Sequence, residues 1–297
     1  MIDRFTDVPG LRIGHAHDAV VNTGVTIIVP DAPAVMAVDV RGGGPGTRET
    51  DALDPSTLVE RVHGLALAGG SVFGLATGDE LVLCLSAAGI GLAMGPGVPA
   101  VPVVPGAILF DLANDGDKSW GAEPPYRRLT RAAYAALGSD DGSGRQGAGW
   151  GARAGSRAGG IGSVSAVLSN GHRIGALIAV NCFGEVYAGA PPDGAVAMPK
   201  LGRVAGLADA GSRNTTIGVI ATDAPLTRAE ARRVAMMAHD GLARCVRPIH
   251  CPFDGDSLFV LSTAAPGSGG SDPVTLTEIG TIAADLVARA VRRAVFG

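Results

Sequence analysis

The order of strand-like and helix-like segments most constrains how this chain can fold. Runs rich in β-branched residues, which favour strands, occur in groups, and so do segments with helical spacing of apolar residues. The expected strands lie at 25–29, 35–40, 160–168, 174–180, 216–221 and 257–263, and the expected helices at 57–67, 72–85, 227–244 and in the C-terminal segment. Because strands and helices do not alternate strictly, we expect layered α+β packing in preference to a doubly wound sheet.

Turn residues predict how some of these segments connect. Pro30, Asp31 and Pro33 lie between the first two runs, so an early hairpin is expected there. The turn sequence at 169–172 predicts a second hairpin, between 160–168 and 174–180. Thr227 followed by Glu230 is a capping box that marks the start of a helix.

The uncharged stretch at 81–110 is long enough to span a bilayer if it were helical. Four prolines interrupt it, at positions 96, 99, 102 and 105, and proline breaks helices. We therefore expect a helix end, a turn and a buried strand.

Composition excludes several classes of function. The formal net charge of −4 has no concentrated basic stretch behind it, which argues against nucleic-acid binding. The first residues lack the basic-then-apolar layout of a secretory signal. The four cysteines form no C-x-x-C pair, so a zinc knuckle is not expected. We expect four free thiols in a reducing cytoplasm.

Common cofactor motifs are absent or out of context. The segment 142–147 matches G-x-G-x-x-G, but no strand precedes it and no helix follows, so nucleotide binding is not expected. The Gly-rich segment 138–162 holds Trp150 and three arginines, which predicts an ordered loop system and not a flexible linker. His15 and His17 have no matching ligand cluster nearby, so neither a metal nor a cofactor is expected.

The sequence Asn214-Thr215 opens an apolar, β-branched strand and is a candidate self-cleavage junction. Cleavage there would make Thr215 an N-terminal residue that carries a hydroxyl and an α-amine. An α-amine with a pKa of about 8 can act as the base for the adjacent hydroxyl. An ordinary turn before a strand is the simplest alternative, and Asn-Thr-Thr also fits a glycosylation sequon.

Asp254 and Asp256 form a second candidate site in the sequence Phe253-Asp-Gly-Asp256. In an extended backbone, residues two apart project to the same side, so the two carboxyl groups are expected to lie close together. Close carboxyl groups can orient a hydroxyl and share a proton. An isolated D-G-D is also typical of a turn or of a calcium-type loop.

Together these motifs make the chain similar to the DmpA-type peptidases, which include L-aminopeptidase/D-esterases, β-peptidyl aminopeptidases and nylon-oligomer hydrolases. The resemblance extends over nearly the whole chain in the family's order. Its landmarks are 48–51, 59–63, 68–75, 147–149, 159–163, 179–181, 214–224, 238–243 and 252–256.

The resemblance implies one domain, 1–297, with an αββα four-layer sandwich of the Ntn-hydrolase type. It implies self-cleavage into an α chain, 1–214, and a β chain, 215–297, with Thr215 as nucleophile. Asp254 and Asp256 would orient groups and move protons, and the Asn181 amide would donate to the oxyanion. The implied activity is release of N-terminal amino acids or cleavage of small ω-amino amides, by a homo-oligomer of αβ units. The threonine at 215 matches the branch that contains the nylon-oligomer hydrolases.

Two positions depart from the family pattern. Members often carry Tyr where this chain has Phe110, and a Lys in the Gly-rich segment where only Arg153 or Arg157 could substitute. Arginine keeps the charge but is a poor base. An acyltransferase on a related fold and a binding protein that never cleaves are the alternative functions.

Overall fold

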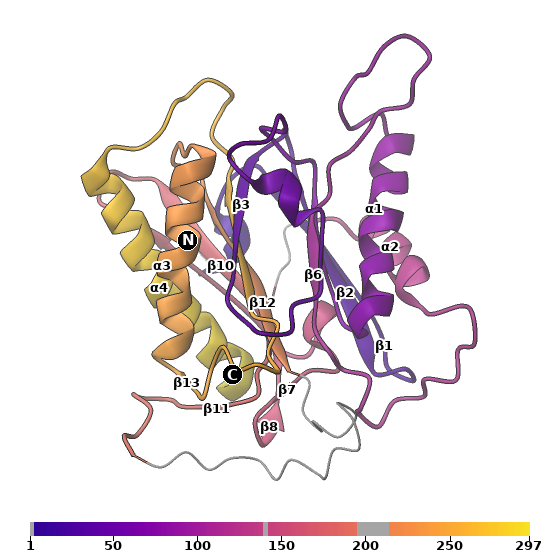
Figure 1. Ribbon diagram of the computed structural model, residues 1–297, viewed down its shortest axis with the longest axis vertical. Coiled ribbons are helices and arrows are strands. Elements are labelled where there is room, and N and C mark those ends of the chain that lie inside the picture. Colours follow the sequence, from indigo (N-terminus) through magenta and orange to yellow (C-terminus); the bar gives the residue numbers. More distant parts are fainter. Residues whose placement is uncertain (1–2, 139–141, 195–213) are drawn as a thin grey trace.

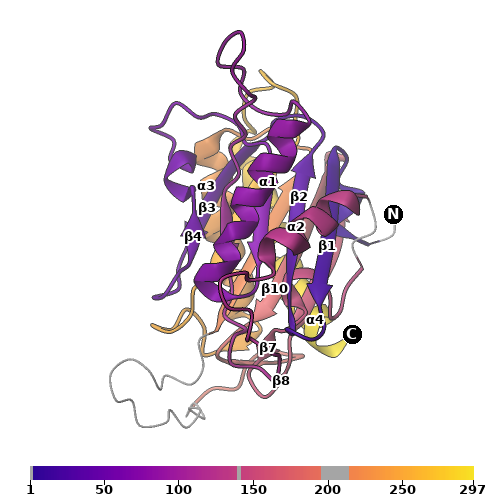
Figure 2. The ribbon, with the colours of Figure 1, turned by 90° about the vertical axis from the view of Figure 1, so that its right-hand side faces the viewer.

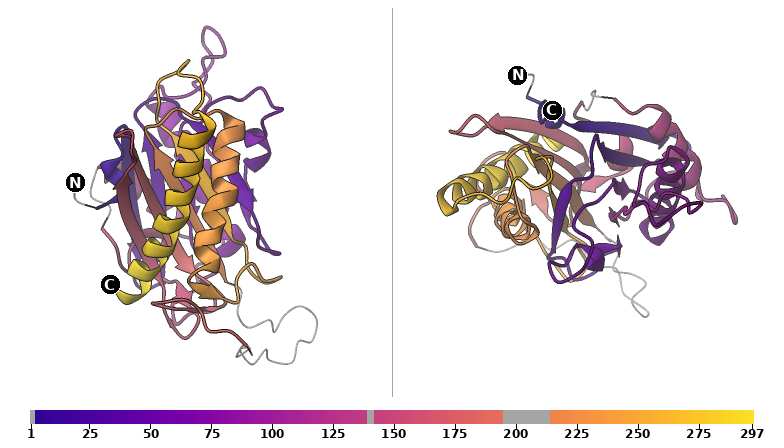
Figure 3. Two further views of the ribbon diagram at one scale, coloured as in Figure 1. Left: turned by 90° about the vertical axis from the view of Figure 1, so that its left-hand side faces the viewer. Right: turned by 90° about the horizontal axis from the view of Figure 1, so that it is seen from above.

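The structure is a computed structural model that describes residues 3–138, 142–194 and 214–297. Two five-stranded sheets pack face to face, and a pair of helices covers each outer surface (Figure 1). The result is the expected αββα sandwich, with layers in the order helices, sheet, sheet, helices. Figure 3 shows the same layers from the left-hand side of Figure 1 and from above.

The first sheet has the strand order β1-β2-β5-β6-β4. Its members are β1 (Leu11–Asp18), β2 (Thr23–Pro30), β4 (Thr47–Arg48), β5 (Leu65–Ala68) and β6 (Gly106–Ile108). Helices α1 (Ala76–Ala87) and α2 (Tyr126–Ala135) cover its outer face (Figure 2).

The second sheet has the order β3-β14-β12-β10-β9. Its members are β3 (Val35–Val40), β9 (Gly160–Val167), β10 (Arg173–Asn181), β12 (Thr215–Thr222) and β14 (Ser257–Ser262). Strand β12 is central, antiparallel to β10 and parallel to β14. Helices α3 (Arg228–Ala243) and α4 (Pro273–Phe296) cover the outer face.

Short elements complete the described chain. The 3₁₀ turns are η1 (Phe5–Asp7), η2 (Thr50–Leu53), η3 (Ser71–Leu75) and η4 (Gly147–Gly149). The two-residue strands β7 (Arg153–Ala154) and β8 (Arg157–Ala158) pair with each other, as do β11 (Glu185–Val186) and β13 (Val246–Arg247).

Alternation along β12 assigns its side chains to two different cores. Ile217, Val219 and Ala221 lie in the core between the sheets, whereas Ile220 lies in the core under α3 and α4. Burial on both faces explains why the strand is almost continuously apolar. Thr215 therefore belongs to the inter-sheet side, because successive residues of a strand face opposite ways.

Most of the expected elements are confirmed. The hairpin of β9 and β10 forms through the turn at 169–172, and the capping box at Thr227 and Glu230 begins α3. The stretch 81–110 contains the end of α1, a loop and the short buried strand β6. Residues 142–162 form ordered turns and strands, while 139–141 lie outside the described residues.

The expected early hairpin was wrong. Strand β2 pairs with β1 and β5 in the first sheet, whereas β3 pairs with β14 in the second. The proline-containing connection at 31–34 therefore carries the chain from one sheet to the other.

The helix expected at 57–67 was also wrong. Leu58 is 96% exposed, and Leu65 begins β5, which is buried between β2 and β6. A short apolar run fits either a helix or a buried strand, and here pairing with two neighbours selects the strand.

Candidate active site

Thr215 and Asn181 lie directly opposite each other at one end of the central pair of strands. The register of β10 and β12 pairs Asn181 with Thr215. Both residues are buried, with 1% and 4% of their surfaces exposed. Paired residues in a sheet project to the same face, so both side chains lie on the inter-sheet side. Two of the residues predicted from the sequence are thus brought together.

The Thr215 hydroxyl lies against the peptide group that precedes it. Its Oγ1 donates a hydrogen bond to the Asn214 carbonyl oxygen at 2.6 Å. The Gly255 N–H donates to that same oxygen at 3.2 Å and to Thr215 Oγ1 at 3.1 Å. One backbone donor therefore contacts both the hydroxyl and the carbonyl that the hydroxyl would attack.

The Asn181 side-chain amide is held at both ends. Its Oδ1 accepts from the Arg153 N–H at 2.8 Å, and its Nδ2 donates to the Phe110 carbonyl oxygen at 3.0 Å. Because the N–H of Arg153 can only donate and the carbonyl of Phe110 can only accept, these two bonds assign the oxygen and the nitrogen of the Asn181 amide. An amide nitrogen carries two hydrogens, so Nδ2 has a second N–H to offer a substrate.

Asp254 and Asp256 are completely buried, and their oxygens accept mainly from backbone N–H groups. Asp254 accepts from the N–H groups of Phe183 and Cys251 at 3.3 and 3.0 Å. Asp256 accepts from the Thr216 N–H at 2.8 Å through Oδ1, and from His250 through Oδ2. Among the described residues, no hydrogen bond joins either carboxyl group to Thr215 Oγ1; the link is the backbone of Gly255.

The two carboxyl groups differ in environment. Burial, and then the nearby charge of Asp256, raises the pKa of Asp254 to about 7. The same two carboxyl groups also shift the pKa values of the neighbouring thiols. Burial and both carboxylates raise the pKa of Cys182 well above its ordinary value, and burial together with Asp254 raises that of Cys251 to about 12. At neutral pH these thiols are therefore protonated and not nucleophilic.

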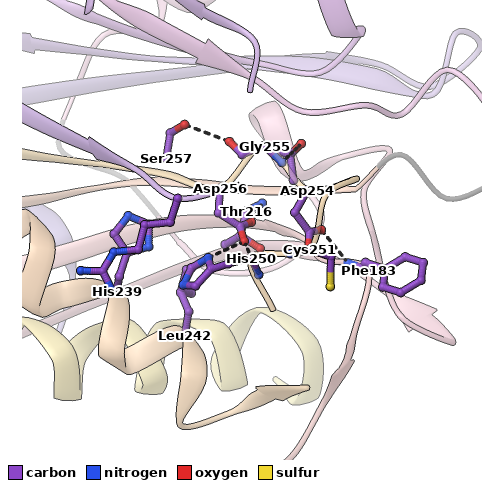
Figure 4. Close-up of polar contacts among 12 residues, drawn as sticks. Phe183, Thr216, His239, Leu242, His250, Cys251, Asp254, Gly255, Asp256 and Ser257 are labelled. Atoms are coloured by element: carbon purple, nitrogen blue, oxygen red, sulfur yellow. Dashed lines mark hydrogen bonds and ion pairs between the residues drawn. The ribbon is translucent and has the colours of Figure 1, made fainter. Parts of the chain in front are cut away.

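The carboxyl groups of Asp254 and Asp256 lie on the helix-covered side of the sheet (Figure 4). The pleat of β12 directs the Thr215 hydroxyl to the opposite, inter-sheet side. Cys182, whose pKa both carboxylates raise, belongs to the core under α3 and α4. The two carboxyl groups lie close enough that the charge of Asp256 contributes to the raised pKa of Asp254. Their role in positioning or proton transfer stays a prediction.

His250 and His239, which sequence reasoning did not include in the site, complete its helix-covered side (Figure 4). His250 donates to Asp256 Oδ2 through both its backbone N–H, at 3.1 Å, and its ring Nδ1, at 2.8 Å. The His239 ring on α3 packs edge-on against it, with 4.9 Å between ring centroids. His250 lies in a loop without periodicity, so no sequence pattern pointed to it.

The two departures from the family pattern have different consequences. Phe110 contributes its backbone carbonyl to Asn181, and a backbone contact does not depend on the side chain. Arg153 also contacts Asn181 through its backbone, with an exposed side chain. The guanidinium of Arg157 lies over the Phe296 ring, 5.3 Å from its centroid.

Asp111, which follows Phe110, is buried and bonded to the first sheet. Asp111 accepts from Thr23 Oγ1 at 2.7 Å and from the Gly70 N–H at 2.7 Å. Burial raises its pKa to about 6 despite these donors. This anchor fixes the backbone that presents the Phe110 carbonyl to Asn181.

Within 3–138, 142–194 and 214–297, no group of three or more His, Cys, Asp or Glu side chains could hold a metal ion. No helix in these ranges is long and apolar enough to cross a membrane.

The family model "Peptidase family S58" matches residues 3–297. The chain belongs to peptidase family S58. It is therefore a hydrolase of peptide or amide bonds, as the resemblance predicted.

Members of family S58 with curated sequences are similar over almost the whole chain. An "uncharacterized aminopeptidase" of Mycobacterium tuberculosis is 42% identical over 98% of this chain and 92% of its own length. A "6-aminohexanoate-oligomer endohydrolase" of Paenarthrobacter ureafaciens is 28% identical over 97% of this chain and 84% of its own length.

Solved structures confirm the fold. A Burkholderia β-aminopeptidase superposes with a TM-score of 0.75 at 24% identity, covering 99% of this chain and 86% of that one. An L-aminopeptidase D-Ala-esterase/amidase from Ochrobactrum anthropi, described as a variant of the Ntn-hydrolase fold, gives 0.75 at 20% identity, covering 98% and 85%. The S58 chain thus has an Ntn-hydrolase-type α+β sandwich.

Proposed function

We propose that this protein is a self-processing amide hydrolase in which Thr215 is the nucleophile. Cleavage between Asn214 and Thr215 produces the chains 1–214 and 215–297. The observation that carries the proposal is the contact of Thr215 Oγ1 and the Gly255 N–H with the Asn214 carbonyl oxygen. The nucleophile and a donor for the developing oxyanion are both in place at the bond to be cut.

Self-cleavage proceeds by a shift of the acyl group from nitrogen to oxygen. Thr215 Oγ1 attacks the Asn214 carbonyl carbon, and the Gly255 N–H donates to the carbonyl oxygen as negative charge develops there. The bond from that carbon to the Thr215 nitrogen then breaks, and the nitrogen takes up the hydroxyl proton. Water hydrolyses the resulting ester to leave the Asn214 carboxylate, the Thr215 hydroxyl and a new α-amine.

Turnover reuses the same hydroxyl on a substrate amide. The new α-amine accepts the Thr215 hydroxyl proton as Oγ1 attacks the substrate carbonyl carbon. The second N–H of Asn181 Nδ2 donates to the oxyanion, a type of contact worth about 3 kcal/mol of transition-state stabilisation. The α-amine returns the proton to the departing amine, and water then hydrolyses the acyl-enzyme.

In this mechanism, Asp254 and Asp256 act by positioning. They hold the backbone of Thr216 and of the Gly255 segment, which carries the donor to the hydroxyl and the carbonyl. Because its pKa is raised to about 7, Asp254 can both carry and release a proton near neutral pH.

The substrate class follows from the relatives. One relative is named an aminopeptidase and another a 6-aminohexanoate-oligomer hydrolase. Both names describe hydrolysis of amide bonds between amino-acid units, so we propose N-terminal aminoacyl amides and small ω-amino amides as substrates. Assembly of αβ units into a homo-oligomer and a cytoplasmic location stay predictions.

The test is hydrolysis of a panel of aminoacyl anilides and ω-amino amides by the parent, Thr215→Ala and Thr216→Val proteins. The Thr216 hydroxyl lies on the opposite face of β12 from the Thr215 hydroxyl and, among the described residues, has no hydrogen-bond partner, so Thr216→Val is a matched control for a lost threonine hydroxyl. We expect the parent and Thr216→Val to release amine at similar rates and Thr215→Ala to lose activity by at least about 1,000-fold. Full activity in Thr215→Ala would exclude Thr215 as nucleophile.

A further inference from the structure

His250 holds one oxygen of Asp256 with two donors at once. The backbone N–H and the ring Nδ1 of His250 both lie within hydrogen-bond distance of Asp256 Oδ2, at 3.1 and 2.8 Å. Asp256 Oδ1 accepts from the Thr216 N–H, the first peptide group after the nucleophile. A continuous polar connection therefore runs from the His250 ring to the backbone of Thr215 and Thr216.

The backbone of His250 is in an unusual conformation that makes this double contact. Its φ is +57°, in the left-handed region that most residues avoid. The structure therefore keeps a conformation that costs about 1 kcal/mol or more. Such strain persists where surrounding contacts determine it, and here those contacts are the two bonds to Asp256.

Hydrogen-bond roles assign the protons on the two rings. The Asp39 carbonyl can only accept, so His239 Nε2, 2.9 Å away, carries a proton. By the same reasoning His250 Nδ1 carries the proton that faces the Asp256 carboxylate. His239 Nδ1 and His250 Nε2 are buried without a hydrogen-bond partner among the described residues. A neutral His239 ring fits this arrangement, because a second proton on its Nδ1 would be buried without an acceptor.

The lowered pKa of His239 agrees with a neutral His239 ring. Burial lowers the pKa of His239 to about 4, and His250 contributes in the same direction. The titratable or charged groups around the two rings are Asp39, Arg41, Cys182, Cys251, Asp254 and Asp256.

We propose that His250 is a positioning residue of the active site: its ring Nδ1 and its backbone N–H hold Asp256 Oδ2, and Asp256 Oδ1 in turn holds the peptide group that links Thr215 to Thr216. The inference rests on the proposed function of Thr215. It also gives the two carboxyl groups different contacts: Asp256 accepts from three N–H groups, two of them from His250, whereas Asp254 accepts from the N–H groups of Phe183 and Cys251.

Two substitutions separate the ring's donor from the backbone conformation. Glycine and asparagine both tolerate positive φ, so neither His250→Gly nor His250→Asn disturbs the main chain. Only asparagine retains an N–H donor near the position of Nδ1. Denatured full-length precursor is diluted into buffers between pH 5 and 9, and the appearance of the two fragments is followed by gel and mass spectrometry.

We expect His250→Gly to slow self-cleavage by about 10- to 100-fold, the effect of losing one hydrogen bond to a charged group. The acid limb of its pH–rate profile moves to higher pH, because the acidic pair holds its protons more readily without the donor. His250→Asn stays within about threefold of the parent rate, with the parent's acid limb. A purely structural role would not move the acid limb.

Two outcomes would overturn the inference. The first is a His250→Gly protein with the parent rate and pH profile. The second is a folded His250→Asn protein that is slower than the parent by more than about tenfold, and this result stands even if the glycine variant does not fold. A parent protein that never cleaves would refute the proposed function itself. Thr215→Ala serves as the uncut reference throughout.

Discussion

Thr215 and Thr216 are neighbours with identical side chains and opposite surroundings. The Thr215 hydroxyl bonds to the Asn214 carbonyl and the Gly255 N–H on the inter-sheet side. The Thr216 hydroxyl faces the helix-covered side and, among the described residues, is buried without a hydrogen-bond partner. The pleat of one strand thus gives one hydroxyl a reactive position and leaves the other with a desolvation penalty.

Thr216→Val is therefore expected to be neutral or stabilising, by up to about 1 kcal/mol, because valine matches the shape of threonine and removes an unpaired hydroxyl. Self-cleavage should proceed at the parent rate. Urea unfolding and fragment formation measure both effects. A loss of more than about 1 kcal/mol would show that the hydroxyl has a stabilising partner.

His239→Gln tests the buried neutral ring through the pH dependence of stability. The folded-state pKa of His239, about 4, lies below its ordinary value of 6.5, so the unfolded chain binds the proton first as pH falls. The stabilisation is present above pH 6.5 and is lost between pH 6.5 and 4, by up to about 3 kcal/mol.

Glutamine keeps the donor to the Asp39 carbonyl but does not titrate. In the Thr215→Ala background, which stays one chain, the variant should lose about 2 to 3 kcal/mol less than the histidine protein between pH 7 and 4.5, measured by urea unfolding. Parallel curves for the two proteins would contradict a buried neutral His239.

Sequence reasoning selected Thr215, Asp254 and Asp256 as candidates, because each belongs to a short motif next to a strand, and the family resemblance added Asn181. It could not assign their faces. The register that pairs Asn181 with Thr215 and the segment that carries the acidic pair come from parts of the chain far apart in sequence. His250 was missed because its contact with Asp256 depends on a backbone conformation that no local pattern indicates.

At the scale of elements, the loop after β3 covers the acidic segment. The N–H groups of Arg41 and Gly44 donate to the carbonyls of Asp256 and Asp254. A Cβ on Gly42 would lie 2.4 Å from the Asp254 carbonyl oxygen and from the Asp256 nitrogen. This backbone approach requires glycine at position 42.

Gly42→Ala is expected to displace the segment that holds Gly255. We predict a loss of stability of about 1 to 3 kcal/mol and self-cleavage at least tenfold slower. Gly44→Ala is the matched control, because a Cβ there would meet its nearest atoms at 3.6 Å, an ordinary contact. Equal behaviour of the two variants, in melting temperature and cleavage rate, would refute the close-packing explanation.

The sequence predicted correctly the strands whose pairing partners are near in the chain and the helices whose capping residues lie beside them in the sequence. The β9–β10 hairpin and helix α3 are examples. The early hairpin failed because β2 and β3 find their partners in different sheets. The helix at 57–67 failed because β5 is defined by pairing with β2 and β6, which local periodicity does not report.

At the scale of the whole molecule, the proposed cut lies at the start of the central strand of a sheet. Strand β12 of the 215–297 chain would lie between β10 of the first chain and β14 of its own. Strand β3 of the first chain would still pair with β14. Separating the two chains would therefore expose both the inter-sheet core and the core under α3 and α4.

We predict that the cleaved chains remain together under native conditions. Native mass spectrometry and size-exclusion chromatography should show both chains in one species, which separates only in denaturant. Dissociation in dilute neutral buffer would contradict the shared-sheet arrangement.

The central claim is that Thr215 cuts its own peptide bond. Denaturing intact mass of the purified parent, beside Thr215→Ala and Thr216→Val, tests it most directly. The account predicts two fragments, 1–214 and 215–297, in the parent and in Thr216→Val, and a single chain in Thr215→Ala. A full-length mass in the parent after prolonged incubation, or the same cut in Thr215→Ala, would contradict it.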